Sequence, residues 1–130
     1  MEAGPKAERT GKVPTEELGP AFVVVEIDGK RCLTDEAVHT TFSEAFGFPY
    51  FYGRSWDAWI DLMSRLNDES NDCDFVVPDK AVVCMSVKSA KVIKEKAPKI
   101  WEDLNECTAF VNWRLVTNNE APFLALSFYD

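Results

Sequence analysis

The sequence Ala81-Val82-Val83-Cys84-Met85-Ser86-Val87 is an apolar run of the length of one strand. Apolar runs of this kind are typical of a buried strand. Working outward, the nearest comparable runs lie at residues 21–27 (AFVVVEI) and 123–128 (FLALSF). The first of these is so rich in β-branched residues that it predicts a strand covered on both faces. Residues 81–87 are therefore expected to be the second of three buried strands.

Two helices are predicted in each interval between these strands. In the first interval, Thr34 is placed to cap a helix that Gly47 ends, and a second helix is expected over about residues 56–66. In the second interval, residues 89–96 predict a short helix, and Pro98 begins a longer one to about residue 116. Because two-helix connections join successive strands, the fold class is α/β, with a three-stranded parallel sheet, about four helices and right-handed crossovers.

The composition limits the class of partner. The chain has 130 residues, with 22 acidic against 14 basic side chains and a formal charge of −8. This charge argues against binding to nucleic acid or an anionic membrane and is compatible with a basic protein partner. No apolar run approaches the ~20 residues of a membrane span, and the start lacks the apolar core of a signal peptide, so a cytoplasmic location is expected. Residues 1–20 are predicted to be a disordered tail and residues 21–130 one domain.

Cysteine and histidine give little sign of chemistry. The four cysteines show no C-x-x-C pair and are expected to be free thiols, with Cys84 and Cys107 buried as small hydrophobic residues. A four-cysteine zinc site stays a remote alternative, because no ligand pair has the close spacing it needs. His39 is the only histidine and is expected at the surface or partly packed.

No catalytic, metal or cofactor site is predicted. Ser55 lies in G-R-S-W-D, which lacks the second glycine of a nucleophile elbow. The acidic residues from Asp68 to Asp79 echo a calcium loop, but Cys73 stands where that loop needs glycine. A carboxylate-dependent metal hydrolase using Asp57 and Asp61 is a third hypothesis, without histidine support.

The helix predicted after Ser55 has one acidic and one apolar side. With Ser55 as N-cap, about 100° per residue places one set of polar residues within about 60° of each other: Asp57, Asp61, Ser64 and Asp68. The apolar set projects to the opposite side: Trp56, Trp59, Leu62, Met63 and Leu66. The two tryptophans are expected to pack in the core. The acidic side is either a solvated face or a surface for a cationic partner, and the pattern alone leaves both open.

The segment Phe48-Pro49, followed by Phe51-Tyr52-Gly53-Arg54-Ser55-Trp56-Asp57-Ala58-Trp59-Ile60-Asp61, resembles the barstar family of intracellular ribonuclease inhibitors. The order of strands and helices over about residues 21–130 is similar to that family. The segments Asn112-Trp113-Arg114 and Leu124-Ala125-Leu126 look most like its bacterial barstar-related members.

The resemblance implies a function. In barstar, the second helix and the turn before it plug the cationic active site of the ribonuclease barnase. The matching residues here are Phe51 and Tyr52 in the turn, Asp57, and Asp61 as the central phosphate mimic. The candidate partner-binding set is Phe51, Tyr52, Gly53, Ser55, Asp57, Asp61, Ser64 and Arg65. The chain is expected to be a non-enzymatic inhibitor or immunity protein against a ribonuclease or similar toxin, monomeric when free. The alternative is an interaction module with a non-nuclease partner or with itself.

Four departures from barstar suggest a partner other than barnase. Phe51 lacks the hydroxyl of the family's tyrosine, and Arg65 stands where barstar has glycine. Leu66 replaces a tryptophan, and Leu115 aligns with an acidic residue of barstar's last helix. The fold and the acidic helix are unaffected by these changes.

Overall fold

The protein contains a parallel sheet of three strands. The computed structural model describes residues 21–130, so the tail predicted over residues 1–20 lies outside the described residues. The strands are β1 (Phe22–Asp28), β2 (Val82–Lys88) and β3 (Leu124–Phe128), in the order β1-β2-β3. Both pairs are parallel, which confirms the predicted sheet.

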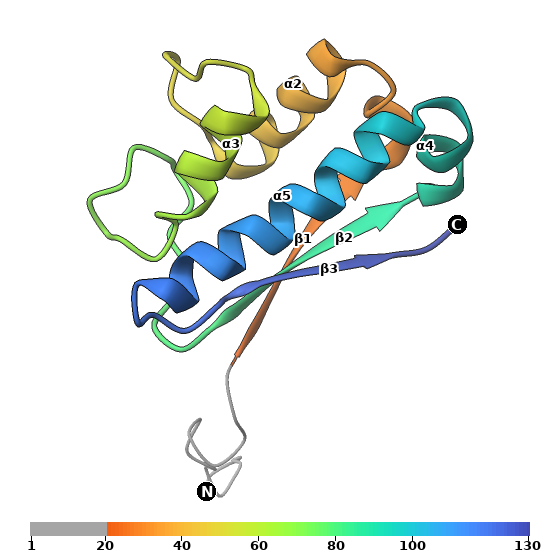
Figure 1. Ribbon diagram of the computed structural model, residues 1–130. Helices are drawn as coiled ribbons and strands as arrows, with labels where there is room; N and C mark the ends of the chain where they lie inside the picture. The colour runs from red at the N-terminus through yellow and green to blue at the C-terminus, as the bar shows by residue number, and fades with distance from the viewer. Residues whose placement is uncertain (1–20) are drawn as a thin grey trace, which may run out of the picture.

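Two helices lie between β1 and β2, and two more lie between β2 and β3, as predicted. The first pair is α2 (Asp35–Phe46) and α3 (Trp56–Met63), after a short 3₁₀ turn, η2 (Gly29–Arg31). The second pair is α4 (Ala90–Lys96) and α5 (Pro98–Thr117). The caps are where the sequence placed them, since the Thr34 hydroxyl accepts from the Ala37 amide at 3.0 Å and Gly47 ends α2 in the left-handed conformation, with φ 64°. Figure 1 shows α2, α3 and α5 gathered on one side of the sheet.

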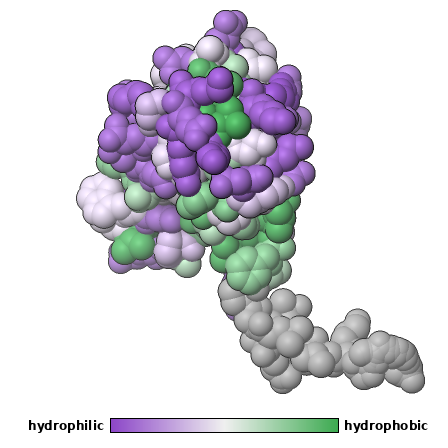
Figure 2. Space-filling view, turned by 90° about the vertical axis from the view of Figure 1, so that its right-hand side faces the viewer, coloured by the Kyte–Doolittle hydropathy of each residue, from purple (hydrophilic) through white to green (hydrophobic). Residues whose placement is uncertain are grey.

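The helices cover one face of the sheet, so the prediction that residues 21–27 are covered on both faces is wrong. Phe22 and Val24 of β1 are 70% and 66% exposed, and buried and half-buried residues alternate along β2. The cause is the strand order: right-handed crossovers that all step in the same direction put every connecting helix on the same face. In Figure 2, hydrophobic side chains gather on the side of the described part where β1 begins.

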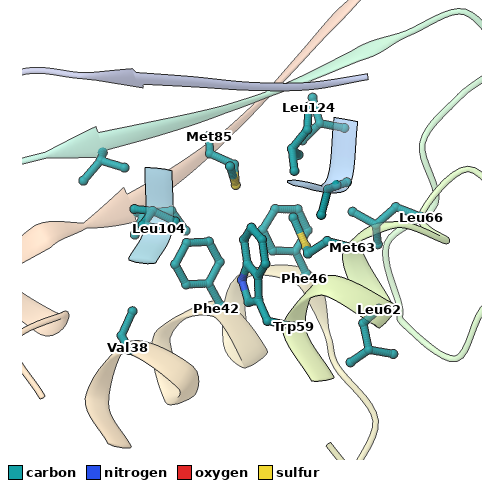
Figure 3. Packing of buried hydrophobic residues seen from close by; sticks show 14 of the residues in the cluster. Val38, Phe42, Phe46, Trp59, Leu62, Met63, Leu66, Met85, Leu104 and Leu124 are labelled. Atoms are coloured by element: carbon teal, nitrogen blue, oxygen red, sulfur yellow. The ribbon is translucent and has the colours of Figure 1, made fainter. Parts of the chain in front are cut away.

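The core lies between this sheet and the helices. Figure 3 shows Phe42 and Phe46 of α2, Trp59 and Met63 of α3, and Met85 of β2 pointing toward one another. Trp59 is fully buried and meets the Phe42 ring edge to face, with ring centroids 5.6 Å apart. The predicted core side is confirmed for Trp59, Leu62 and Met63 of α3 and for Leu66 just beyond its end, whereas Trp56 is half-buried.

The four cysteines are free, but the expected pair is not the buried one. Cys32 and Cys73 are buried, whereas Cys84 and Cys107 are only half-buried. Cys84 lies beside Val24 on the uncovered face of the sheet, and Cys107 of α5 is packed against the edge of the core. Burial raises the pKa of the Cys32 thiol to about 11.

None of the helices in residues 21–130 combines the length and the hydropathy that a membrane span requires.

Candidate partner-binding face

The helix α3 presents Asp57 and Asp61 to solvent one turn apart. Its start is fixed by Ser55, whose hydroxyl oxygen accepts a hydrogen bond from the Ala58 amide at 3.2 Å. Its inner side is fixed by the buried Trp59, together with Leu62 and Met63. Because the helix is held on its opposite side, the two carboxylates are presented on a rigid element.

The helix is shorter than predicted and ends at Met63, not near residue 66. The next turn is tighter, because the Arg65 amide donates to the Leu62 carbonyl, three residues back, at 3.1 Å. Asp68 therefore does not continue the acidic side: it lies in a loop, where it accepts hydrogen bonds from Ser70. Ser64 is buried, and its hydroxyl donates to the Ile60 carbonyl at 2.6 Å.

The turn before α3 has an exposed and a buried half. Tyr50 and Phe51 are 99% and 58% exposed. Phe48 and Tyr52 are buried against each other, with ring centroids 4.7 Å apart. Phe51 is thus exposed to a partner, whereas Tyr52 belongs mainly to the packing of the turn.

His39 is buried, which corrects the prediction that it lies at the surface or is partly packed. Its Nδ1 atom lies 2.6 Å from the hydroxyl oxygen of Tyr52, and its ring meets Trp56 edge to face. Burial, and then the positive charge of Arg54, lower the pKa of His39. The Tyr52 hydroxyl also lies 3.5 Å from the Ser55 carbonyl oxygen, to which it can donate, so the tautomer of His39 sets which partner donates in the bond between His39 and Tyr52. The spacing from His39 to Phe42 and Phe46 is that of one helix face, a signal that could have revealed its burial.

Arg114 of α5 is the residue at this face that sequence reasoning missed. Its Nη1 atom lies 3.0 Å from Oδ1 of Asp61. Leu115 is buried, so the position that aligns with an acidic residue of barstar contributes no polar group here, and its neighbour Arg114 does. Asp61 and Arg114 are 53 positions apart, and no local spacing connects them.

A hollow of about 280 Å³ lies beside this ion pair, between the ends of α3 and α5. Its charged lining residues are Asp61, Arg65, Arg114 and Glu120. Arg65 also approaches Asp72, at 3.8 Å. Of the two α3 carboxylates, Asp61 thus borders a hollow whose lining carries both positive and negative side chains.

The remaining predicted site residues are spread around this face. Gly53 and Ser55 are exposed at the start of α3, and Arg65 is exposed just after its end. Within residues 21–130, no three histidine, cysteine, aspartate or glutamate side chains gather as a metal site would require. The arrangement is that of an amphipathic surface helix, with exposed carboxylates on one side and the other side packed in the core.

Comparison with known proteins gives the family. A comparison with curated proteins found no match. The family model described as Barstar (barnase inhibitor) matches residues 22–126, which include all three strands apart from the end of β3. Since this match covers most of the chain and the observed strand and helix order agrees with it, the chain belongs to the barstar family.

Proposed function

We propose that this protein is a cytoplasmic inhibitor or immunity protein that blocks the cationic active site of a ribonuclease or similar toxin with the acidic side of α3. The observation that supports it best is the pair of exposed carboxylates, Asp57 and Asp61, one turn apart on a helix anchored through Trp59. The family match supports the same role, because its description is that of a barnase inhibitor.

The electrostatics of the chain favour this role. A protein with a formal charge of −8 attracts a basic partner over a long range and accelerates the encounter. At contact, carboxylates form short charge-assisted bonds with arginine or lysine. The proposal includes a non-enzymatic role, a domain over residues 21–130, and a monomer in the free protein.

Binding to a basic ribonuclease tests the proposal. Calorimetry with a panel of basic ribonucleases, barnase among them, first finds one that wild type binds, and then compares wild type with Asp61→Ala, Asp57→Ala and, as a control for charge, Asp79→Ala, an exposed residue of the loop before β2. We expect Asp61→Ala to weaken binding by about tenfold or more and to reduce its salt dependence, because a charge pair is lost at the interface. Equal affinities for Asp61→Ala and Asp79→Ala would contradict the proposal.

A second candidate function is an interaction module for a non-nuclease partner or for a second copy of the chain. The ion pair between Asp61 and Arg114 favours it, because this pair offsets the negative charge where a cationic active site would dock. Sedimentation of the free protein over a wide range of concentrations separates the cases. Concentration-dependent dimers with no ribonuclease binding would support the second candidate.

A further inference from the structure

Arg114 makes two kinds of contact with its guanidinium group. Its Nη1 atom pairs with Oδ1 of Asp61 at 3.0 Å. Its Cζ atom also lies over the ring of Phe110, 5.5 Å from the ring centroid. One planar cation is therefore held by a carboxylate from α3 and an aromatic face from α5.

These two contacts together are the chemistry of a guanidinium-binding site. A carboxylate accepts hydrogen bonds from the planar N–H groups of arginine, and an aromatic ring attracts the same cation to its face. Lysine matches this combination less well, because its ammonium is a compact and strongly hydrated charge. Trp113 enlarges the aromatic surface: it is 60% exposed, and its ring centroid lies 5.4 Å from that of Phe110.

The site is accessible from solvent. The side chain of Asp61 is 68% exposed and that of Arg114 is 37% exposed. Phe110 is 43% exposed, and the neighbouring Trp113 and Val116 of α5 are exposed as well. An exposed ion pair and an exposed cation–ring contact are each weak, so another cation can displace Arg114 at small cost.

We propose that Asp61 and Phe110 form an arginine-binding site that Arg114 fills in the free protein and that an arginine of the partner fills in the complex. This inference rests on the proposed function, in which the acidic side of α3 binds a cationic protein. Arg114 is then an internal competitor, and it makes the chain select partners that present arginine, not lysine, at this point.

A second acidic side chain lies near Arg114. The hollow beside the pair is also lined by Glu120, whose carboxylate accepts a hydrogen bond from Asn67 at 3.0 Å. When the partner's arginine takes Asp61, the guanidinium of Arg114 can turn toward this second carboxylate.

A peptide titration tests the site without knowledge of the natural partner. The probes are acetylated tetra-arginine amide and acetylated tetra-lysine amide, and binding is followed by the NMR signals of the Asp61 and Phe110 amides. We expect Arg114→Ala to bind the arginine peptide about tenfold more tightly than wild type, because the competing contacts are gone. Arg31→Ala is the matched control: it removes the same charge from η2, where Arg31 pairs with Glu44, and should not produce this gain.

The aromatic part of the site is tested in the same background. Adding Phe110→Ala to Arg114→Ala should remove the preference for arginine over lysine, while general attraction to both cationic peptides remains. Equal affinity of wild type and Arg114→Ala for the arginine peptide would overturn the inference. An equal gain in affinity in Arg31→Ala would also overturn the inference, because the change in net charge alone would then explain the effect.

Binding of the same variants to the ribonuclease found with the panel separates this inference from the proposed function. If Asp61→Ala weakens binding to that ribonuclease and Arg114→Ala leaves it unchanged, the function stands and the arginine site is refuted. If neither wild type nor any variant binds barnase or another basic ribonuclease, the function fails, and the peptide titration alone decides for or against the arginine site.

Discussion

At the scale of single residues, the contact between His39 and Tyr52 joins α2 to the turn that leads into α3. The histidine is 3% exposed and the tyrosine 8%. Their hydrogen bond is 2.6 Å long, and the same histidine ring contacts Trp56 at the start of α3. The position of α3 therefore depends on the contact between His39 and Tyr52, two residues that are themselves buried.

The His39 imidazole makes stability depend on pH. Its pKa is lowered by burial from its ordinary value of 6.5, so the folded state disfavours the proton that the unfolded state accepts. The stabilisation is complete above about pH 6.5 and is lost as the pH falls toward the lowered pKa. Urea unfolding should show a steeper loss of stability in wild type than in His39→Gln as the pH falls below about 6.5. If stability depends on pH equally in wild type and His39→Gln, His39 is not the cause of the pH dependence.

The two halves of the turn should respond differently to substitution. Tyr52→Phe removes the hydroxyl and leaves Nδ1 of His39 buried without a partner, which costs about 1–3 kcal/mol of unfolding free energy. Phe51→Ala, at an exposed side chain, should leave stability within about 0.5 kcal/mol and weaken binding to the basic ribonuclease. Thermal unfolding and calorimetry check the two effects. If Phe51→Ala loses stability and binds the ribonuclease as well as wild type does, Phe51 serves packing and not partner binding.

At the scale of elements, α3 is a short helix held at both ends by serine. Ser55 caps its start through the Ala58 amide, and the Ser64 hydroxyl bonds back to Ile60 at its end. A helix of 8 residues has little stability of its own, so caps and core contacts decide whether it forms. The display of Asp57 and Asp61 is therefore a property of the caps and of Trp59.

The cap can be separated from a direct role of Ser55 in binding. Ser55→Ala should cost about 1 kcal/mol of unfolding free energy, because one amide of the first turn loses its acceptor. Ser55→Asp restores an acceptor and should recover most of this loss. Chemical denaturation measures both, with affinity for the basic ribonuclease measured beside it. If Ser55→Asp recovers stability and still binds poorly, Ser55 contacts the partner directly.

At the scale of the whole molecule, the sequence predicted what depends on local pattern. Apolar runs marked the strands, Thr34 and Ser55 marked helix starts, and the two-helix connections implied parallel pairing, which the structure confirms. The contact between Asp61 and Arg114 was out of reach, because it depends on how α3 packs beside α5 and on no spacing along the chain. The uncovered sheet face was missed for a related reason: a β-branched run fits a strand covered on one face as well as on two.

The one-sided sheet leads to a prediction with a matched pair of substitutions. Val24 of β1 is 66% exposed, whereas Val83 of β2 is fully buried against the helices. Val83→Thr should cost about 1–3 kcal/mol, because it replaces a methyl group with a hydroxyl in the core. Val24→Thr should stay within about 0.5 kcal/mol, since threonine suits a strand and its hydroxyl meets water. Urea unfolding of both variants measures the difference. A cost for Val24→Thr as large as for Val83→Thr would mean that something covers the second face in solution, and Val24→Thr would then locate that contact on β1.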